Sequence, residues 1–423
     1  MKTTLILSLS ITLSSGLAAQ VQITLAECHR LAEASHPLSA HMALAEKRGS
    51  ETVELLKYTR YPHASMNAQA TYQSDVTKVE ANIPGVDIPY PSNDQYRVSL
   101  DVLQPIYDGG SVRARQEVAT LSARLEVQQA ETGLLELREQ INRIYAAILM
   151  EQEKAALLRV GENTLLAQRK AVRSGIANGV LLPAAADRLQ VEALKVHQQL
   201  KAAEAERAAY LEVLSGLTGK PLAADVQLAM PQAEQAENYT LDKRPEISAF
   251  ALERQLKEAG IMGINARSAP QLSVFAQAGY GRPGLNMLDD TFQPYYLAGL
   301  QFSWNLSALF TARREKELQR LQQQVIDKRE EAFLLTVSTG MIRLKNEIEQ
   351  LVEVLNDDGE IISLQEKIAA TASSQLQQGV TTASEYIRAQ NELREAKLNR
   401  KMHLIRLRMK QAEWRTQQGL TID

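Results

Sequence analysis

The chain has 423 residues, enough for two or three ordinary domains, and a net charge of −3. A charge so close to zero provides no strong field for nucleic acid or for an anionic membrane surface. The single cysteine, Cys28, excludes an intramolecular disulfide, and aromatic residues make up only 5% of the chain. This composition favours long helices with narrow apolar seams over a thick globular core.

The N-terminal residues have the pattern of a secretory signal peptide. Lys2 precedes an apolar stretch, Leu5–Leu13, and small residues follow as far as Ala19. We therefore predict that residues 1–19 are a signal peptide and that the mature protein is exported. The letters "LAEC" before Cys28 suggest a lipoprotein, but Glu27 and the polar gap after the apolar stretch argue against lipid attachment.

No later segment is predicted to cross a membrane as a helix. The best candidate, residues 291–311, is uncharged but contains Pro294 and Asn305. Polar residues interrupt it at every second or third position, which is typical of a strand.

The sequence contains segments that occur twice. "PHASMNAQATY" from Pro62 matches "PQLSVFAQAGY" from Pro270, and "GVLLPAAADRLQ" from Gly179 matches "GVTTASEYIRAQ" from Gly379. Internal similarity at a fixed distance indicates a duplicated structure. We predict a two-fold repeat, with a first repeat at 20–214, a linker at 215–239 and a second repeat at 240–423.

Each repeat is predicted to contain a helix, a strand, a loop, a second strand and a long helical region. The first helices are expected at Leu25–Tyr61 and Leu241–Ser268, and the long regions at Ser111–Leu214 and Thr311–Gln418. Each long region is expected to fold back on itself. The reversal is predicted near Gly175, Gly179 and Pro183 in the first half and at Gly379 in the second.

Apolar residues in the long regions are spaced by three and four. The seams are Leu134, Leu137, Ile141, Ile144 and Ile148, and then Leu334, Val337, Met341, Leu344 and Ile348. This spacing predicts the narrow stripe of a coiled coil, because helices in a globular core usually show a wider apolar face.

The candidate strands alternate between apolar and polar residues. The apolar positions are Met66, Ala68, Ala70 and Tyr72, then Tyr96, Val98, Leu100 and Val102, and finally Tyr296, Ala298, Leu300 and Phe302. A soluble antiparallel sheet and a membrane barrel both produce this pattern. Four strands cannot close a barrel, so a membrane barrel needs several copies; two copies would give eight strands and three would give twelve.

Loops at one end of these strands fit an outer-membrane protein. The segments Ser74–Asp94 and Gly281–Pro294 join the strands of each pair, and the helices lie at the opposite end. Long external loops opposite periplasmic structure are typical of outer-membrane barrels.

Several of these features together resemble TolC-type outer-membrane efflux proteins. They are the signal peptide, "ITLAECHRLAEASHP" from Ile23, the pair Tyr61–Pro62, "VLQPIYDGGSVRAR" from Val102, and the duplicated glycine tips. The resemblance extends in order over the whole mature chain. Within it, "QPIYDGG" and the paired tips are the most specific motifs.

The resemblance implies a mainly α-helical fold with four transmembrane β-strands per chain. It implies a homotrimer, with a twelve-stranded barrel in the outer membrane of a Gram-negative bacterium and a coiled-coil α-helical barrel in the periplasm. Such proteins are exit ducts of tripartite efflux pumps or type I secretion systems. They dock onto a periplasmic adaptor and an inner-membrane transporter, and they are not enzymes. A periplasmic adaptor is the alternative function, but adaptors normally have one helical hairpin and not two.

The resemblance also points to residues at the predicted hairpin tips. Gly175, Gly179 and Gly379 are expected to form the tips that dock onto the adaptor. Family members often close the tunnel with carboxylates at the sixth and ninth positions after the tip glycine. In this sequence Glu385 matches the sixth position, whereas Arg388 stands at the ninth.

The first-half counterparts complete the predicted constriction. Ala185 and Arg188 stand at the equivalent positions, with Asp187 beside them. Three copies of Glu385 would favour cations. The alternative is an exposed ion pair between Glu385 and Arg388, which are one helical turn apart.

Other chemistry is not indicated. Cys28, His29, His36 and His41 are close in sequence, but their spacing fits no standard zinc pattern and they do not share a helix face. We find no phosphate-binding glycine loop, no GxSxG and no HExxH motif. We therefore expect no metal, no cofactor, no nucleic-acid partner and no catalytic residues.

Overall fold

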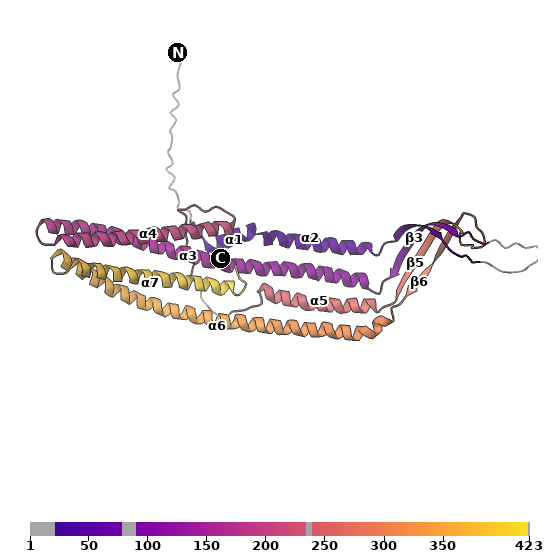
Figure 1. Ribbon diagram of the computed structural model, residues 1–423. Helices are drawn as coiled ribbons and strands as arrows, with labels where there is room; N and C mark the ends of the chain where they lie inside the picture. Colours follow the sequence, from indigo (N-terminus) through magenta and orange to yellow (C-terminus); the bar gives the residue numbers. More distant parts are fainter. Residues whose placement is uncertain (1–21, 78–89, 234–238, 422–423) are drawn as a thin grey trace, which may run out of the picture. The chain divides into compact units, whose positions relative to one another are not determined.

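The computed structural model describes residues 22–77, 90–233 and 239–421 (Figure 1). The predicted signal peptide and most of the loop predicted at Ser74–Asp94 lie outside the described residues. In chain order the elements are β1 (Gln22–Ile23), α1 (Leu25–Ser35), α2 (Pro37–Tyr58), β2 (His63–Tyr72), β3 (Asp94–Tyr107), α3 (Ser111–Ala177), α4 (Pro183–Thr218), β4 (Gln227–Leu228), α5 (Pro245–Arg267), β5 (Gln271–Arg282), β6 (Gln293–Ser303), α6 (Ser307–Gln377) and α7 (Ala383–Thr416).

The chain divides into two compact units, each made of segments from both halves of the sequence. The first unit contains Met1–His36, Leu135–Tyr239 and Met341–Asp423. The second contains Pro37–Leu134 and Thr240–Gly340. We describe each unit separately. Among the described residues, no helix has a stretch both long and apolar enough to cross a membrane.

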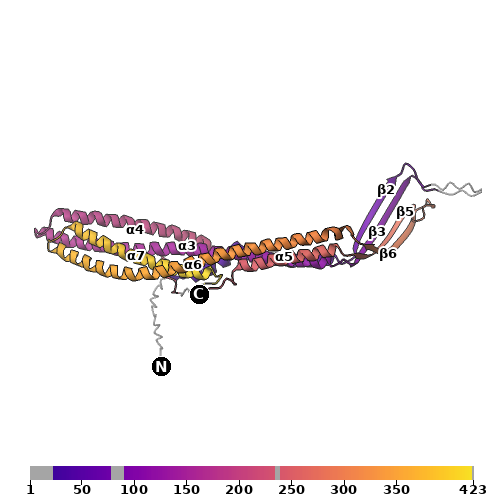
Figure 2. The same ribbon diagram turned by 90° about the horizontal axis from the view of Figure 1, so that it is seen from below.

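The second unit contains a four-stranded sheet with the order β2-β3-β5-β6 (Figure 2). All three pairings are antiparallel. The register places residues of equal parity side by side, so that Met66 is opposite Leu100, Leu100 is opposite Ala278, and Ala278 is opposite Tyr296. The apolar positions predicted from alternation on β2, β3 and β6 therefore share one face of the sheet.

The turn from β3 into α3 is built from an aspartate and two glycines. Asp108 accepts hydrogen bonds from the amides of Gly110, at 3.0 Å, and Val112, at 2.7 Å, and so caps α3. Gly109 and Gly110 have φ values of 66° and 87°, which favour glycine. A Cβ on Gly109 would lie 2.8 Å from the carbonyl oxygen of Ala266, so the turn approaches α5 closely.

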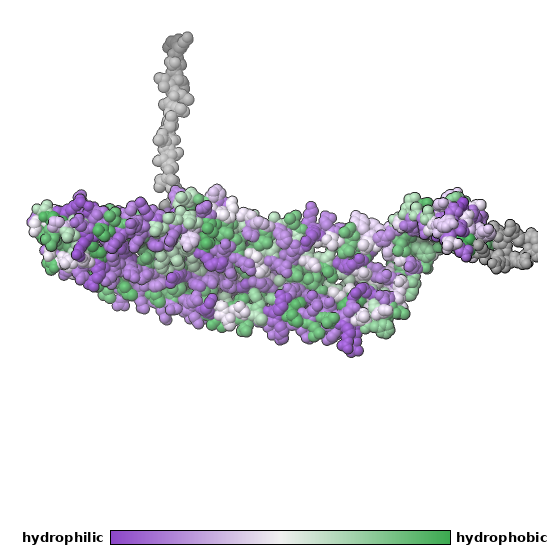
Figure 3. All heavy atoms as spheres, in the orientation of Figure 1, coloured by the Kyte–Doolittle hydropathy of each residue, from purple (hydrophilic) through white to green (hydrophobic). Residues whose placement is uncertain are grey.

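The first unit contains two helical hairpins, α3 with α4 and α6 with α7, which run side by side in both ribbon views (Figures 1 and 2). An apolar core joins residues from all four helices, including Leu165, Leu189, Leu376 and Tyr386. On the face seen in Figure 3, hydrophilic residues dominate the helices and apolar residues are scattered among them.

A buried polar chain connects α1, α3 and α7 in the first unit. His29 Nε2 donates to Asn142 Oδ1 at 2.9 Å, and Asn142 Nδ2 donates to Thr416 Oγ1 at 3.1 Å. Nearby, the Tyr145 hydroxyl lies 3.0 Å from the carbonyl oxygen of Ile23 and 2.6 Å from that of Ala229. These contacts hold the parallel pair β1 and β4 against α3.

One prediction about the helices is wrong. The first helix was expected to run unbroken over Leu25–Tyr61, but it is two helices separated at His36. Pro37 explains the break, because the residue before a proline is pushed out of the helical region, and His36 has ψ 137°. Along α3, the seam residues Leu137, Ile141 and Ile148 are buried, and Leu135, Tyr145 and Leu149 are buried beside them.

The Gly109 turn leads to a first prediction. Gly110→Ala should cost about 1–2 kcal/mol of stability, because alanine is strained at a positive φ. Gly109→Ala should cost more, because its Cβ would also collide with Ala266 and Ala269. Thermal unfolding followed by circular dichroism in detergent would compare the two variants, and equal losses would contradict a close approach at Gly109.

The buried histidine leads to a second prediction. Burial lowers the pKa of His29 from 6.5 to about 4, with the Asn142 hydrogen bond acting in the opposite direction. The folded chain therefore holds His29 neutral, while the unfolded chain binds a proton below pH 6.5. This contribution to stability is complete above pH 6.5 and is lost as the pH falls towards 4, by about 3 kcal/mol at most.

His29→Gln tests this because the glutamine Nε2 can donate the same hydrogen bond but does not titrate. Between pH 7.5 and pH 4.5 the variant should lose less stability than wild type in matched urea titrations. His36→Gln is the control, because His36 is not part of the buried chain. Parallel losses in wild type and His29→Gln would show that His29 does not titrate as expected.

Candidate functional site

The two hairpin tips of the first unit have the same backbone structure. After α3, the amide of Gly179 donates to Ile176 O at 3.0 Å and that of Val180 donates to Gly175 O at 2.9 Å. After α6, the amides of Gly379 and Val380 donate to Leu376 O at 3.1 Å and to Gln375 O at 2.9 Å. The glycines have φ values of 74° and 73°. Both tips are Schellman motifs, in which a left-handed glycine closes the helix.

The three glycines predicted at the tips do not all lie at the point where the chain reverses. Gly179 and Gly379 lie at the reversals themselves. Gly175 lies in the last turn of α3, where an added Cβ would be 2.9 Å from Leu181 Cδ1. Gly175 therefore leaves room for Leu181 to pack, and the chain reverses after it.

The helices that leave the tips start in different ways. Pro183 occupies the first turn of α4, where its missing amide hydrogen costs nothing. Thr382 caps α7 by accepting a hydrogen bond from the amide of Glu385 at 3.3 Å. The Glu385 carboxylate consequently lies in the first turn of α7, where the helix dipole stabilises a negative charge.

The structure brings three of the four predicted constriction residues together with α7. Arg388 pairs with Glu385 at 2.9 Å, and both side chains are more than half exposed, at 70% and 52%. Arg188 of α4 donates to Ser384 Oγ of α7. Asp187 is exposed and has no hydrogen bond or ion pair with any other residue in the described ranges. The site therefore carries two acidic and two basic side chains.

Glu385 and Arg388 line an open cavity of about 510 Å³ between α6 and α7. Its other lining residues include Lys367, Ile368, Thr371, Gln375 and Glu392. Its charges are of both signs, and apolar side chains contribute only part of the wall. This arrangement can attract small charged solutes electrostatically, and it has no nucleophile and base in contact.

Apolar residues are exposed at the tips themselves. Val180, Leu182 and Val380 are 54%, 77% and 72% exposed. The two tips also approach each other, because a Cβ on Gly379 would lie 3.2 Å from Val180 Cγ1. Exposed apolar side chains on a rigid, capped turn suit contact with another protein.

A polar network behind the tips was not predicted from the sequence. Glu192 of α4 accepts a hydrogen bond from Asn391 of α7 at 2.9 Å and lies 3.8 Å from the Arg394 guanidinium. Arg394 also donates to Asn391 Oδ1 at 2.6 Å, and Gly161 of α3 leaves room for its side chain. Burial lowers the pKa of Arg394, and Glu192 counteracts this effect. The network connects the two hairpins.

The cysteine and the histidines near the N-terminus have separate contacts and do not form one site. Cys28 is fully buried, and burial raises its pKa to about 12. His29 bonds to Asn142, and His41 lies 2.9 Å from Glu126. In the part of the chain that the structure describes, no group of three or more histidine, cysteine, aspartate or glutamate residues could hold a metal ion.

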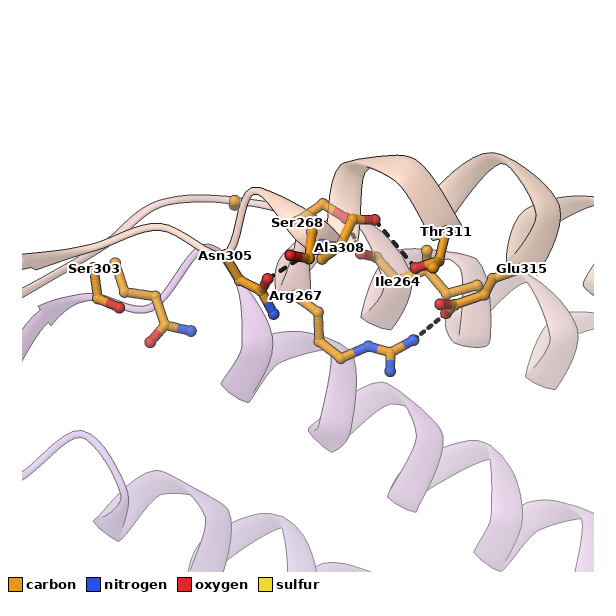
Figure 4. A pocket seen from close by; sticks show the side chains of 11 residues that line it. Ile264, Arg267, Ser268, Ser303, Asn305, Ala308, Thr311 and Glu315 are labelled. Carbon is orange, nitrogen blue, oxygen red and sulfur yellow. Dashed lines mark hydrogen bonds and ion pairs between the residues drawn. The ribbon is translucent and has the colours of Figure 1, made fainter.

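A second cavity, of about 500 Å³, lies in the second unit at the junction of strands and helices (Figure 4). Its polar groups bond mainly to one another. Arg267 pairs with Glu315, and the Thr311 hydroxyl donates to Ala308 O at 3.4 Å. Asn305 Oδ1 accepts from the amide of Ala308 at 3.2 Å, so Asn305 caps α6 as Asp108 caps α3. The residues around this cavity therefore stabilise the bend between the strands and the helices.

The Glu192 network leads to a third prediction. Glu192→Leu should cost about 2–4 kcal/mol, because it leaves the Arg394 charge buried without its partner. Adding Arg394→Met should restore much of this loss, which a double-mutant cycle on thermal unfolding would measure. Glu204→Leu is a matched control, because its pair with Arg159 is exposed and should contribute less than about 1 kcal/mol. Additive effects of the two Glu192 and Arg394 substitutions would contradict a coupled pair.

Comparison with known proteins shows similarity in structure and not in sequence. No protein-family model matches the sequence, and no curated protein matches it. The outer membrane protein VceC from Vibrio cholerae has a TM-score of 0.68 at 16% identity, covering 94% of this chain and 97% of that one.

Two further outer-membrane channels are similar in structure to this chain. For the open state of the MtrE outer membrane channel from Neisseria gonorrhoeae, the TM-score is 0.69 at 16% identity, with coverage of 94% and 89%. For the CmeC outer membrane channel from Campylobacter jejuni, the TM-score is 0.66 at 13% identity, with coverage of 93% and 85%. The hairpins, the shared sheet and these likenesses together show that the chain has the fold of the TolC-type outer-membrane channels.

Proposed function

We propose that the protein is the outer-membrane exit duct of an efflux pump or a type I secretion system and acts as a homotrimer. The observation that carries the proposal is the sheet of the second unit. Its large apolar side chains are exposed on one face, and its two edge strands lack partners in the described chain. A membrane barrel built from several copies explains both features at once, because lipid would cover the apolar face and neighbouring copies would pair with the edge strands.

The apolar face is too large for an ordinary soluble surface. Its exposed side chains include Met66 at 75%, Leu100 at 51%, Tyr296 at 83%, Leu300 at 72% and Phe302 at 65%. Contiguous exposed apolar surface of this kind marks contact with protein or lipid. The opposite face carries polar side chains such as Asn67, Asp101 and Gln277. Apolar outside and polar inside is the pattern of a membrane barrel.

The edges of the sheet determine how many chains are needed. Among the described residues, β2 pairs only with β3, and β6 pairs only with β5. Unpaired backbone groups cannot remain in lipid, so β6 of one copy must pair with β2 of the next. Each strand has 10 to 14 residues, enough to span a membrane at a tilt. Three copies supply twelve strands, which leave a water-filled lumen.

The helical hairpins would continue this lumen through the periplasm. Each half has a strand pair followed by a helical hairpin, β2 and β3 before α3 and α4, and β5 and β6 before α6 and α7, which supports a duplicated chain with repeats at 20–214 and 240–423 and a linker at 215–239. We place the adaptor contact at the tips, where Gly179 and Gly379 expose Val180, Leu182 and Val380. The adaptor would connect the duct to an inner-membrane transporter that supplies the energy.

The charged residues of the tips would form the constriction. In a trimer, Glu385 would occur three times around the axis and favour cations over small anions. Arg388 competes with this role, because it neutralises Glu385 within each copy. Arg188 and Asp187 bring a further charge of each sign to the same level. The cavity between α6 and α7 supports access of solutes to these groups.

The location and the oligomer lead to a fourth prediction. The protein should fractionate with the outer membrane and need detergent for recovery, since an apolar barrel surface requires lipid or detergent. Light scattering of the detergent complex, corrected for bound detergent, should give three times the mass of the mature chain. Recovery of a monomer in the soluble periplasmic fraction would refute the proposal.

The constriction leads to a fifth prediction. In planar bilayers, Glu385→Ala channels should be less cation-selective than wild type, because the tip loses its acidic ring. Arg388→Ala is the matched control and should shift the reversal potential in the opposite direction. Unchanged conductance and selectivity in Glu385→Ala would show that Glu385 is a surface residue with no role in gating.

A further inference from the structure

Two charged residues lie on the polar face of the sheet, on the same strand. Asp101 and Arg97 both belong to β3, and their neighbours in register are Ser65 and Gln69 of β2. They share a face because they are four residues apart and side chains alternate along a strand. At about 3.3 Å per residue, their levels along the strand differ by about 13 Å.

The Asp101 carboxylate is held in place by side chains from three strands. It accepts hydrogen bonds from Asn67 of β2 at 2.6 Å, from Ser99 of β3 at 2.9 Å, and from Gln277 of β5. These donors fix both carboxylate oxygens and leave the charge on the polar face. No basic side chain in the described ranges pairs with Asp101.

Arg97 differs from Asp101 because it is exposed. Within the described ranges its guanidinium has no ion pair or hydrogen bond. Arg97 is nearer the start of β3, beside the loops, whereas Asp101 is nearer the end that leads into α3. The remaining charged residues of the sheet, Asp94 and Arg282, pair with each other at the loop end and have the parity of the apolar face.

We infer that the barrel lumen contains an anionic ring of Asp101 residues and, nearer the exterior, a cationic ring of Arg97 residues. This inference rests on the proposed trimer, because three copies are needed to repeat each charge around an axis. The rings act separately, because the Debye length at physiological ionic strength is about 8 Å, less than the separation of about 13 Å.

The two rings would affect cargo according to its charge. A cation leaving the helical tunnel meets attraction at Asp101 and then repulsion at Arg97, and an anion meets the reverse order. Neutral and zwitterionic solutes meet no net barrier. The barrel would therefore select solutes by their charge at a second place, in addition to the tips.

Single-cysteine reporters test the inference without any dependence on the tips. The only native cysteine, Cys28, is fully buried, so it provides a silent background. Ser65→Cys reports on the level of Asp101, and Gln69→Cys on that of Arg97. The measurement is the modification rate by a cationic and an anionic methanethiosulfonate reagent in outer-membrane preparations, normalised to a small thiol.

We expect the cationic reagent to be favoured at Ser65→Cys and the anionic reagent at Gln69→Cys. Asp101→Asn should lower the ratio of cationic to anionic rates at Ser65→Cys about three- to tenfold and change Gln69→Cys much less. Arg97→Gln should do the reverse. Because Asp101→Asn can also impair assembly, both reporters are measured in the native-charge background at about 1 M salt, where screening should abolish the preference.

A third reporter separates this inference from the proposed function. Met66→Cys lies on the apolar face and should be protected by lipid from both reagents. Equal and rapid modification of Met66→Cys and Ser65→Cys would refute the membrane barrel itself. Protection of Met66→Cys, combined with rate ratios that respond neither to Asp101→Asn nor to salt, would refute the charged rings alone.

Discussion

The backbone hydrogen bonds at the edges of the sheet constrain the rest of the structure. In a bilayer each unpaired amide or carbonyl costs several kcal/mol, and both β2 and β6 present a row of them. In the proposed homotrimer, antiparallel pairing of β6 with β2 of the next copy would satisfy both rows at once. The register of that proposed pairing would have to match even-numbered residues with even-numbered residues, because a slip by one residue would turn Met66 and Leu100 of the next copy towards the proposed lumen.

The same constraint explains the contents of the two faces. A fixed carboxylate such as Asp101 is tolerated at mid-strand only where water or polar partners surround it. Asn67, Ser99 and Gln277 supply those partners. The small residues Gly279 and Gly299 on this face lie beneath Tyr295 and Phe275, whose rings cover them across the strand pair. Aromatic cover of a strand glycine restores packing that the missing side chain forfeits.

The parts of the fold and of the tips that could be predicted from the sequence are those determined by residues close together in the chain. The reversals at Gly179 and Gly379 and the alternating strands follow from residues close together in the sequence, and the structure has them at those residues. The break before Pro37 had an equally local signal, but the continuous helical pattern on both sides concealed it. These cases need only backbone sterics and periodicity.

The features that were missed depend on which elements meet in space. The wide buried face of α3 near Tyr145 exists because α1 and the β1 and β4 pair pack there, which the seam spacing does not reveal. Likewise, Glu192 and Arg394 come from different halves of the chain, and the residue that matches Glu192 in the second half is Glu392. A repeat aligns equivalent residues, but it does not show which non-equivalent residues touch.

The tips show how the two halves can share a backbone and differ in chemistry. Thr382 and Glu385 give α7 a polar start, while Leu182 and Pro183 give α4 an apolar one. The exposed Glu385–Arg388 pair contributes at most about 1 kcal/mol, so either side chain can turn to another partner at little cost. With Asp187 and Arg188, each copy brings balanced charge to the tip. In the proposed trimer, six tips could therefore converge without net repulsion, and the orientation of individual side chains, not the total charge, would decide which ions pass.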